Sequence, residues 1–242
     1  MAETAHRRLT ADEFVALPGD LPNAELIDGD VVVDSPNTRH QRLADWILYQ
    51  FMSFTDTHPD AGEGGSALMT RIDDDNVFLP DVWWTTPDHV LARDSRGHVE
   101  RPPDLVVEVR SPTTWRYDVH VKKARYEAVG VTELWLVDTV ADTVLVFRRS
   151  SPGSPTFDAG LEAGVGDTLT TPVIPGFALD LARLFDRGHR RRHARPDDRL
   201  APSGARAPPI AQEASGPSRP GSGQAADAAP LPATGRARRR GR

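Results

Sequence analysis

Two apolar, strand-like runs, the first of them strongly β-branched, with a helix-length segment between them constrain the fold of this chain more than any other feature. The first run, Asp104–Arg110, reads Asp-Leu-Val-Val-Glu-Val-Arg and ends at Ser111-Pro112. A helix is predicted from residue 117 to residue 129, where Gly130 is a suitable C-cap. The second run, Glu133–Asp138, is predicted to be another strand. Two strands joined through a helix are typical of a βαβ crossover, so we expect an α/β fold.

Shorter elements are predicted on both sides of this unit. Thr10–Glu13 is a capping box that opens a helix ending before Pro18, and Glu25–Val33 is predicted to form a hairpin that turns at Asp28-Gly29. A longer helix is expected from about Arg39, because large apolar residues then recur at helical spacing. Further strands are expected near 66–72, 77–85 and 143–148, and the segment 172–177 and a short helix at 180–185 complete the domain.

Charge divides the chain near residue 186. Residues 1–186 contain 16 basic and 31 acidic side chains, a formal charge of −15, whereas residues 187–242 contain 13 and four, a charge of +9. Large apolar residues are nearly absent from the second part, which therefore cannot bury enough surface to offset its ordering entropy. We expect a folded domain at 1–186 and a disordered basic tail rich in Pro, Ala and Arg at 187–242. The tail is either simply solvated, or screens the acidic domain of its own chain, or contacts nucleic acid or another acidic surface.

Several classes of site are excluded. The chain has no cysteine, which rules out disulfides, thiolate zinc sites, iron–sulfur sites and a cysteine nucleophile. It also lacks a phosphate-binding loop, a dinucleotide fingerprint, a zinc-protease helix motif and a serine-nucleophile elbow. No apolar run approaches the ~18 residues of a membrane span, and the first residues lack a signal peptide's hydrophobic stretch. We expect a soluble, cytoplasmic protein without a membrane partner.

Three carboxylates lie on or beside predicted strands. Alternate residues of a strand share a face, so Glu108 is expected opposite to Val107 and Val109. A buried carboxylate is too costly unless it is paired or bound to a cation, so Glu108 must be paired, exposed on an edge or holding a cation. Asp81 shows the same pattern, and Glu25 lies on the predicted hairpin. Each acid alone is also explained as a cap, turn or surface residue, whereas together they form an oxygen-ligand set for a hard metal ion.

Lysine is rare in this chain. Of the 29 basic residues 27 are arginine, and the two lysines, Lys122 and Lys123, are adjacent. Asp118, Lys122 and Tyr126 have the spacing that stacks side chains on one helix face. An ordinary Asp–Lys pair would explain this spacing. The composition, however, favours a role that needs a compact ammonium with an adjustable pKa, which arginine does not provide.

His40 is predicted at the start of the long helix, where it is a candidate metal ligand, proton carrier or packed core histidine. The tryptophans at positions 83, 84 and 135 lie in or beside predicted strands. We expect them to pack in the core rather than to stack on bases.

These residues resemble the Uma2 family of endonucleases, within the PD-(D/E)XK restriction-endonuclease-like superfamily. The resemblance covers about residues 10–186, the whole predicted domain, and also includes Asp118 and Lys122. Its other segments, in order, are Glu25–Asp30, Ser35–His40, Leu79–Val82, Pro103–Pro112, Tyr126–Val131 and Glu133–Asp138.

The resemblance implies a restriction-endonuclease-like core, a central mixed sheet flanked by helices, and metal-assisted hydrolysis of phosphodiester bonds in DNA. Asp81, Glu108 and the Val109 carbonyl would hold Mg²⁺, or alternatively Mn²⁺, and Lys122 would stabilise charge or orient water. Glu25 would match the group's N-terminal acid and His40 its helix-start histidine. The superfamily motif has a lysine where this chain has Arg110, and the Uma2-like pattern places it on the next helix instead.

Two features depart from a standard nuclease. Arg110 cannot act as a general base because its guanidinium stays protonated. A domain of charge −15 is also a poor host for a polyanion, so we expect weak and salt-sensitive DNA binding. The alternative hypothesis is an interaction module that keeps the nuclease fold with weak or no catalysis. The fold also makes a homodimer a candidate assembly.

Overall fold

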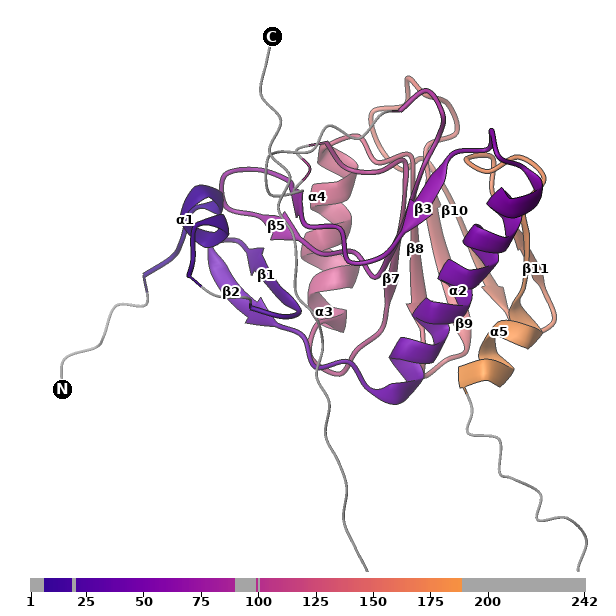
Figure 1. Ribbon diagram of the computed structural model, residues 1–242, viewed down its shortest axis with the longest axis horizontal. Coiled ribbons are helices and arrows are strands. Elements are labelled where there is room, and N and C mark those ends of the chain that lie inside the picture. The colour runs from indigo at the N-terminus through magenta and orange to yellow at the C-terminus, as the bar shows by residue number, and fades with distance from the viewer. Residues whose placement is uncertain (1–6, 19–20, 90–98, 100, 189–242) are drawn as a thin grey trace, which may run out of the picture. The chain divides into compact units, whose positions relative to one another are not determined.

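The computed structural model describes residues 7–18, 21–89, 99 and 101–188, and Figure 1 shows their helices and strands. All of them belong to one unit, Met1–His193. The tail predicted from residue 187 lies outside the described residues, apart from Arg187 and Gly188, which end the last helix. The domain boundary and the disorder of the tail therefore stay predictions.

The parallel pair β7 (Leu105–Val109) and β8 (Glu133–Asp138) lies inside a six-stranded sheet, as the βαβ pattern predicts. The other neighbouring strands in this sheet are antiparallel, so the sheet is mixed. The strand order is β10-β9-β8-β7-β6-β3. β9 (Thr143–Arg148) and β6 (Val82–Thr85) flank the parallel pair, and β10 (Ala159–Gly164) and β3 (Glu63–Gly65) are the edge strands.

Helices cover both faces of this sheet (Figure 1). α2 (Thr38–Thr57) and α5 (Leu181–Gly188) share a core with Val107 and Val109, whereas the helical segment 115–128 packs with Val106 on the other face. Alternation along β7 therefore places Glu108 on the side of the helical segment 115–128, as expected from the sequence. The predicted α/β fold, a mixed sheet flanked by helices, is confirmed.

The tryptophans pack in the core, as predicted. Trp84 and Trp135 are fully buried, and their ring centroids lie 5.4 and 5.9 Å from that of Phe51 in α2. Trp83 is 4% exposed and packs in a smaller cluster. Truncating such a buried aromatic side chain costs about 3–5 kcal/mol, so the rings of Trp84 and Trp135 hold α2 on the sheet.

The N-terminal part forms a second sheet. The capping box at Thr10 opens α1 (Ala11–Val15), and β1 (Ala24–Ile27) pairs with β2 (Asp30–Val33) across the predicted turn. Asp28 and Gly29 have φ angles of 50° and 82°, as a two-residue hairpin turn requires. The strand order is β2-β1-β5-β4, with β4 at Thr70–Arg71 and β5 at Val77–Phe78.

The single strand predicted over 77–85 is wrong. It is two strands in different sheets, β5 in the four-stranded sheet and β6 in the six-stranded one. Pro80 lies between them, and proline has no N–H with which to continue a ladder. The chain therefore crosses from one sheet to the other at Pro80 and Asp81.

The predicted helix from residue 117 to residue 129 is also interrupted. It consists of α3 (Trp115–Tyr117), a π-helical turn at Asp118–Lys122 and α4 (Lys123–Ala128). Single π turns inside helices are rare and frequently lie at functional sites. This one contains both Asp118 and Lys122.

The C-terminal part contains strands that the sequence analysis did not predict. They are β10 and the pair β11 (Thr168–Thr170) and β12 (Ala178–Asp180). The segment 172–177 forms neither helix nor strand. Among the described residues, no helix combines the length and apolar character needed to cross a membrane.

Candidate active site

The crossing between the two sheets places Asp81 beside Glu108. β6 and β7 are antiparallel with Val82 opposite Val107, so the next pair along this register is Asp81 and Glu108. The Val109 N–H donates to Asp81 Oδ2 at 2.7 Å, and His40 Nε2 lies 3.1 Å from the same oxygen. A main-chain donor and an imidazole thus fix the orientation of this carboxylate.

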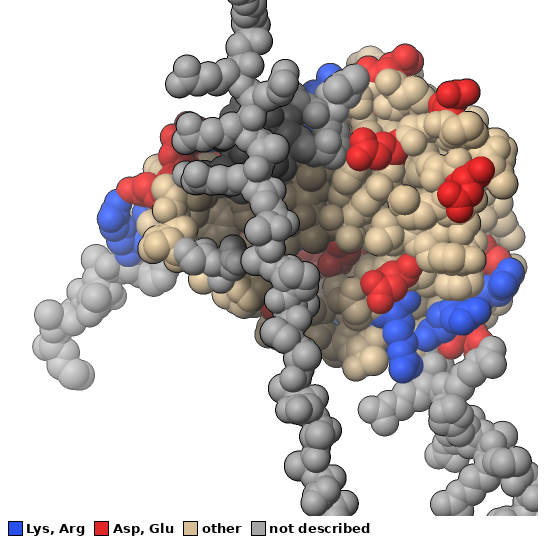
Figure 2. All heavy atoms as spheres, in the orientation of Figure 1, with Lys and Arg blue, Asp and Glu red and all other residues tan. Residues whose placement is uncertain are grey.

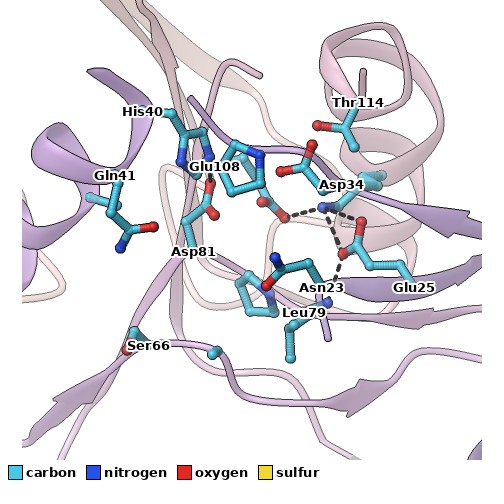
Figure 3. Close-up of a pocket in the computed structure, with 15 residues that line it drawn as sticks. Asn23, Glu25, Asp34, His40, Gln41, Ser66, Leu79, Asp81, Glu108 and Thr114 are labelled. Carbon is cyan, nitrogen blue, oxygen red and sulfur yellow. Dashed lines mark hydrogen bonds and ion pairs between the residues drawn. The ribbon is translucent and has the colours of Figure 1, made fainter. Parts of the chain in front are cut away.

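Lys122 lies among three carboxylates. Its Nζ is 2.8 Å from Glu108 Oε1, 2.9 Å from Glu25 Oε1 and 3.3 Å from Asp118 Oδ1. Figure 3 shows Glu25 and Glu108 directed toward this ammonium from two strands. The four side chains are at most 6% exposed, so bulk water does not screen their interaction.

Each carboxylate around Lys122 has a second donor. The Tyr126 hydroxyl donates to Glu108 Oε1 at 2.7 Å, the Leu79 N–H to Glu25 Oε1 at 2.7 Å, and the Thr114 hydroxyl to Asp118 Oδ2 at 3.2 Å. Tyr126 lies in the helical segment 115–128, Leu79 lies directly before Pro80, and Thr114 is the N-cap of α3. The fold therefore builds the cluster from three separate parts of the chain.

The acidic cluster carries more negative charge than Lys122 offsets. Three ionised carboxylates around one ammonium have a formal charge of −2 in a buried site. Burial raises the pKa values of Glu25 and Asp118 and raises that of Glu108 well above its usual range, with Lys122 acting in the opposite direction. The cluster therefore either keeps protons or attracts a further cation.

The carboxylates also raise the pKa values of Lys122 and Tyr126. Burial disfavours the charged form of Lys122, but Glu108, Glu25 and Asp118 outweigh it and hold the pKa of Lys122 well above its usual range. Burial, followed by the nearby charge of Glu108, raises the pKa of Tyr126 well above its usual range, so its hydroxyl remains a donor.

His40 is nearly buried, with a side chain 4% exposed. Burial opposes its protonation, but the hydrogen bond and charge of Asp81, with more distant acids, outweigh burial and raise the pKa of His40. Its Nδ1 is buried without a hydrogen-bond partner among the described residues. His40 therefore contacts the site through Asp81.

A pocket of about 180 Å³ lies between the two sheets and α2, and several of the side chains described above line it (Figure 3). Its acidic lining residues are Glu25, Asp34, Asp81 and Glu108, and its cationic ones are His40 and Lys122. The structure thus brings five predicted side chains, Glu25, His40, Asp81, Glu108 and Lys122, to one pocket. Val109 contributes its N–H to Asp81, and the predicted role of its carbonyl stays a prediction.

The two lysines lie on different sides of the helix, and Arg110 does not line the active-site pocket. Lys123 Nζ lies 4.7 Å from the Phe147 ring centroid, on the aromatic side of the helix, whereas Lys122 points into the pocket. The Arg110 guanidinium binds both oxygens of Asp138 at 2.9 Å. Asp118 is the side chain that the sequence analysis placed on the right helix face without giving it a role. Its spacing of four residues before Lys122 was the available signal.

The donor chemistry of the pocket fits a hard divalent cation. Mg²⁺ is usually bound through one or two carboxylates and keeps several waters, and Asp81 and Glu108 supply two carboxylates on neighbouring strands. In the part of the chain that the structure describes, no group of three or more His, Asp or Glu side chains is arranged to hold a metal ion by itself. Water and substrate oxygens would therefore complete the coordination of a bound cation.

Comparison with known proteins identifies the family and a similar fold. Residues 11–182 match the Uma2 family, whose description is "Putative restriction endonuclease". The fold is similar to that of a crystal structure described as a "putative nuclease belonging to DUF820" from Anabaena variabilis ATCC 29413. The TM-score is 0.62 at 20% identity, and the match covers 75% of this chain and 99% of that one. No curated protein matches the chain. The family match includes every residue of the pocket.

Proposed function

The chain belongs to the Uma2 family, and on that premise we propose that it is a metal-dependent endonuclease that hydrolyses phosphodiester bonds in DNA. The observation that carries this proposal is the convergence of Asp81, Glu108 and Lys122 on one pocket. Two carboxylates and an ammonium at one point are the groups that metal-assisted phosphodiester hydrolysis needs.

The residues of the pocket have distinct roles in this proposal. Asp81 and Glu108 would hold Mg²⁺ or Mn²⁺, which supplies Lewis-acid polarisation of the phosphate and a water of lowered pKa. Lys122 would stabilise the negative charge that develops on the phosphate oxygens. Glu25, which contacts Lys122 at 2.9 Å, positions that ammonium, and His40 positions Asp81.

The charge of the domain predicts how DNA binding behaves. Residues 1–186 carry a formal charge of −15, and in Figure 2 acidic side chains are spread over the face that α2 crosses. Several basic side chains on that face lie near the end where α2 begins, and others lie at the left and upper edges of the view (Figure 2). Because neutralisation of phosphates by Lys and Arg dominates DNA affinity, we expect weak binding that falls steeply with salt.

A cleavage assay tests the proposal. Purified full-length protein is incubated with circular plasmid, linear duplex and single-stranded DNA in Mg²⁺, in Mn²⁺ and in EDTA. We expect nicking or linearisation of the circular plasmid, which only an endonuclease produces, and its loss in EDTA and in Glu108→Gln. Absence of cleavage with both metals, or equal cleavage by Glu108→Gln, would refute the proposal.

The acidic domain also favours a second candidate, an interaction module that keeps the fold without catalysis. Titration calorimetry with Mn²⁺ distinguishes the two, because the nuclease must bind a divalent cation at the pocket. Binding that Asp81→Asn abolishes supports the nuclease. A folded protein that binds no divalent cation supports the interaction module.

A further inference from the structure

A second pocket lies beside the first, at the end of β7. It has a volume of about 400 Å³ and is lined by Arg110, Ser111, Pro112, Thr113, Trp115 and Arg116. We call this surface the arginine notch. None of the functional roles above uses it, and it contains the arginine that replaces the lysine of the superfamily motif.

The arginine notch and the active-site pocket have opposite charge. Four acidic residues line the active-site pocket, and its only lysine is surrounded by carboxylates. Two arginines and no acidic residue line the notch. Asp138 offsets the charge of Arg110, and Asp34 accepts hydrogen bonds from Ser111 and Thr113 at the wall that faces the active-site pocket. Arg116 is therefore the exposed cation of the notch.

The side chains of the notch are held in position and partly accessible. The Arg110 guanidinium binds both oxygens of Asp138 at 2.9 Å and lies 5.2 Å from the Trp115 ring centroid. Arg116 is exposed, and its Nη2 donates to the Tyr117 hydroxyl at 2.7 Å. A guanidinium has five N–H donors, so Arg116 can also donate to a phosphate in this position.

The two pockets share a hydrogen-bonded wall. The Ser111 hydroxyl, which lines the notch, donates to Asp34 Oδ1 at 2.6 Å and lies 2.8 Å from the Thr114 hydroxyl. Asp34 and Thr114 both line the active-site pocket. A continuous nucleic-acid strand with one phosphate in the active-site pocket would therefore pass the notch within a neighbouring nucleotide.

We propose that the arginine notch binds the phosphodiester backbone of the substrate strand next to the bond that is cleaved. Arg116 contacts the flanking phosphate, and the half-buried Trp115 ring provides a surface on which a base stacks. Arg110, whose charge is offset by Asp138, packs beside the Trp115 ring and holds this side of the notch in place. This inference rests on the proposed nuclease function and assigns the place where an acidic nuclease holds its polyanionic substrate. Arg110 therefore shapes the substrate-binding surface and, unlike the lysine of the superfamily motif, does not act at the metal.

Binding measured without cleavage tests this inference. Fluorescein-labelled single-stranded DNA, duplex DNA and RNA are titrated with full-length protein in Ca²⁺, with the integrity of each probe checked on a gel. The variants are Arg116→Glu, Arg116→Lys and Arg183→Glu. Arg183 is also an exposed arginine beside an aromatic ring, that of Trp46, so Arg183→Glu is a control for the same change of charge elsewhere on the domain.

We expect Arg116→Glu to weaken binding about tenfold or more and to lower the salt slope by about one phosphate contact. Arg116→Lys should retain most of the binding, and Arg183→Glu should change it less than about twofold, because a distant charge acts only through screened repulsion. Unchanged circular dichroism spectra would show that the variants fold. The single-stranded, duplex and RNA probes identify which strand the notch prefers.

Three results would overturn the inference. The first is equal binding by Arg116→Glu and Arg183→Glu, and the second is no binding of any probe by the wild type. The third is competition by polyglutamate, which has charge but no phosphates or bases, that is as effective as competition by unlabelled nucleic acid. The nuclease proposal is judged separately by plasmid cleavage. If the wild type cleaves plasmid and Arg116→Glu binds DNA as well as the wild type does, only the notch proposal is refuted. If Arg116→Glu loses binding and the wild type does not cleave, only the nuclease proposal is refuted.

Discussion

Replacing Lys122 with methionine should destabilise the protein in a way that depends on pH. Methionine keeps the length of the side chain but removes the ammonium that lies 2.8, 2.9 and 3.3 Å from three buried carboxylates. Breaking a buried ion pair typically costs about 3–5 kcal/mol, because the remaining charge is left without compensation. We expect Lys122→Met to lose about that much free energy of unfolding at pH 8.

The sign of the pH dependence follows from the pKa values of the carboxyls. Burial raises the pKa values of Glu25, Glu108 and Asp118 above those in the unfolded chain, and Lys122 limits this rise. A group whose folded pKa is raised contributes stability below its unfolded pKa and loses it as the pH rises through the folded pKa. Without Lys122 the carboxyl pKa values rise further. The difference in free energy of unfolding between Lys122→Met and the wild type should therefore be small near pH 5 and large at pH 8.

Lys123→Met is the matched control. Lys123 lies over the Phe147 ring at 4.7 Å on the other side of the helix, a cation–π contact worth about 0.5–1 kcal/mol. Urea unfolding in EDTA, followed by tryptophan fluorescence at pH 5 and pH 8, measures both variants. Equal losses for Lys122→Met and Lys123→Met, or a loss for Lys122→Met that does not change with pH, would refute this electrostatic description of the site.

Three further predictions concern single contacts. Tyr126→Phe removes a buried hydroxyl that donates to Glu108 at 2.7 Å, and we expect a loss of about 1–3 kcal/mol in urea unfolding, whereas an unchanged midpoint would contradict the contact. Burial raises the pKa of Glu133, so the stability of the wild type falls relative to that of Glu133→Gln as the pH rises above about 4.5. In thermal unfolding, the loss of melting temperature caused by Glu133→Gln should therefore be smaller at pH 7.5 than at pH 4.5, and the opposite trend would contradict this prediction. Gly29→Ala should lower stability by about 1–3 kcal/mol in the same unfolding assay, because φ is 82° and the added Cβ would lie 2.8 Å from the Arg8 Cβ; a neutral effect would refute this.

Local signals in the sequence predicted the elements that local forces determine. The capping box at Thr10, the turn at Asp28-Gly29 and the β-branched run of β7 each depend on neighbours in the chain. The residues alone left the choice between Lys122 and Lys123 open, and the family resemblance pointed to Lys122, which the structure places against the buried carboxylates. The family resemblance assigned these residues to one site.

Elements that depend on distant contacts were not predictable in this way. Phe78 and Val82 lie in one predicted strand, 77–85, and its division between two sheets depends on which strands lie beside each half. β10 contains mainly Gly and Ala and is a strand because it pairs with β9 along its whole length. Glu25 and Lys122 are 97 residues apart, so only the folded chain brings them together.

The same distinction applies to Arg110. The family resemblance indicated that Arg110 stands where the superfamily motif has a lysine, but its partner Asp138 is 28 residues away at the end of the adjacent strand. Arg110 and Trp115 are close because β7 turns directly into α3. The orientation of this arginine toward the notch rather than the active-site pocket is thus a consequence of strand pairing.

The rate of Mg²⁺-dependent DNA cleavage by Asp81→Asn tests the central claim most directly. Asp81→Asn keeps the size of the side chain and the acceptor for the Val109 N–H but removes one of the two proposed metal-binding carboxylates. Loss of an outer-shell partner of a metal ligand commonly costs about 10–100-fold in metal affinity or activity, and loss of a direct ligand such as Asp81 should cost at least as much. In single-turnover reactions on a labelled duplex we therefore predict at least about a 100-fold slower rate for Asp81→Asn, with Lys123→Met close to wild type. Equal rates for Asp81→Asn and wild type would contradict the claim that this pocket is the catalytic metal site.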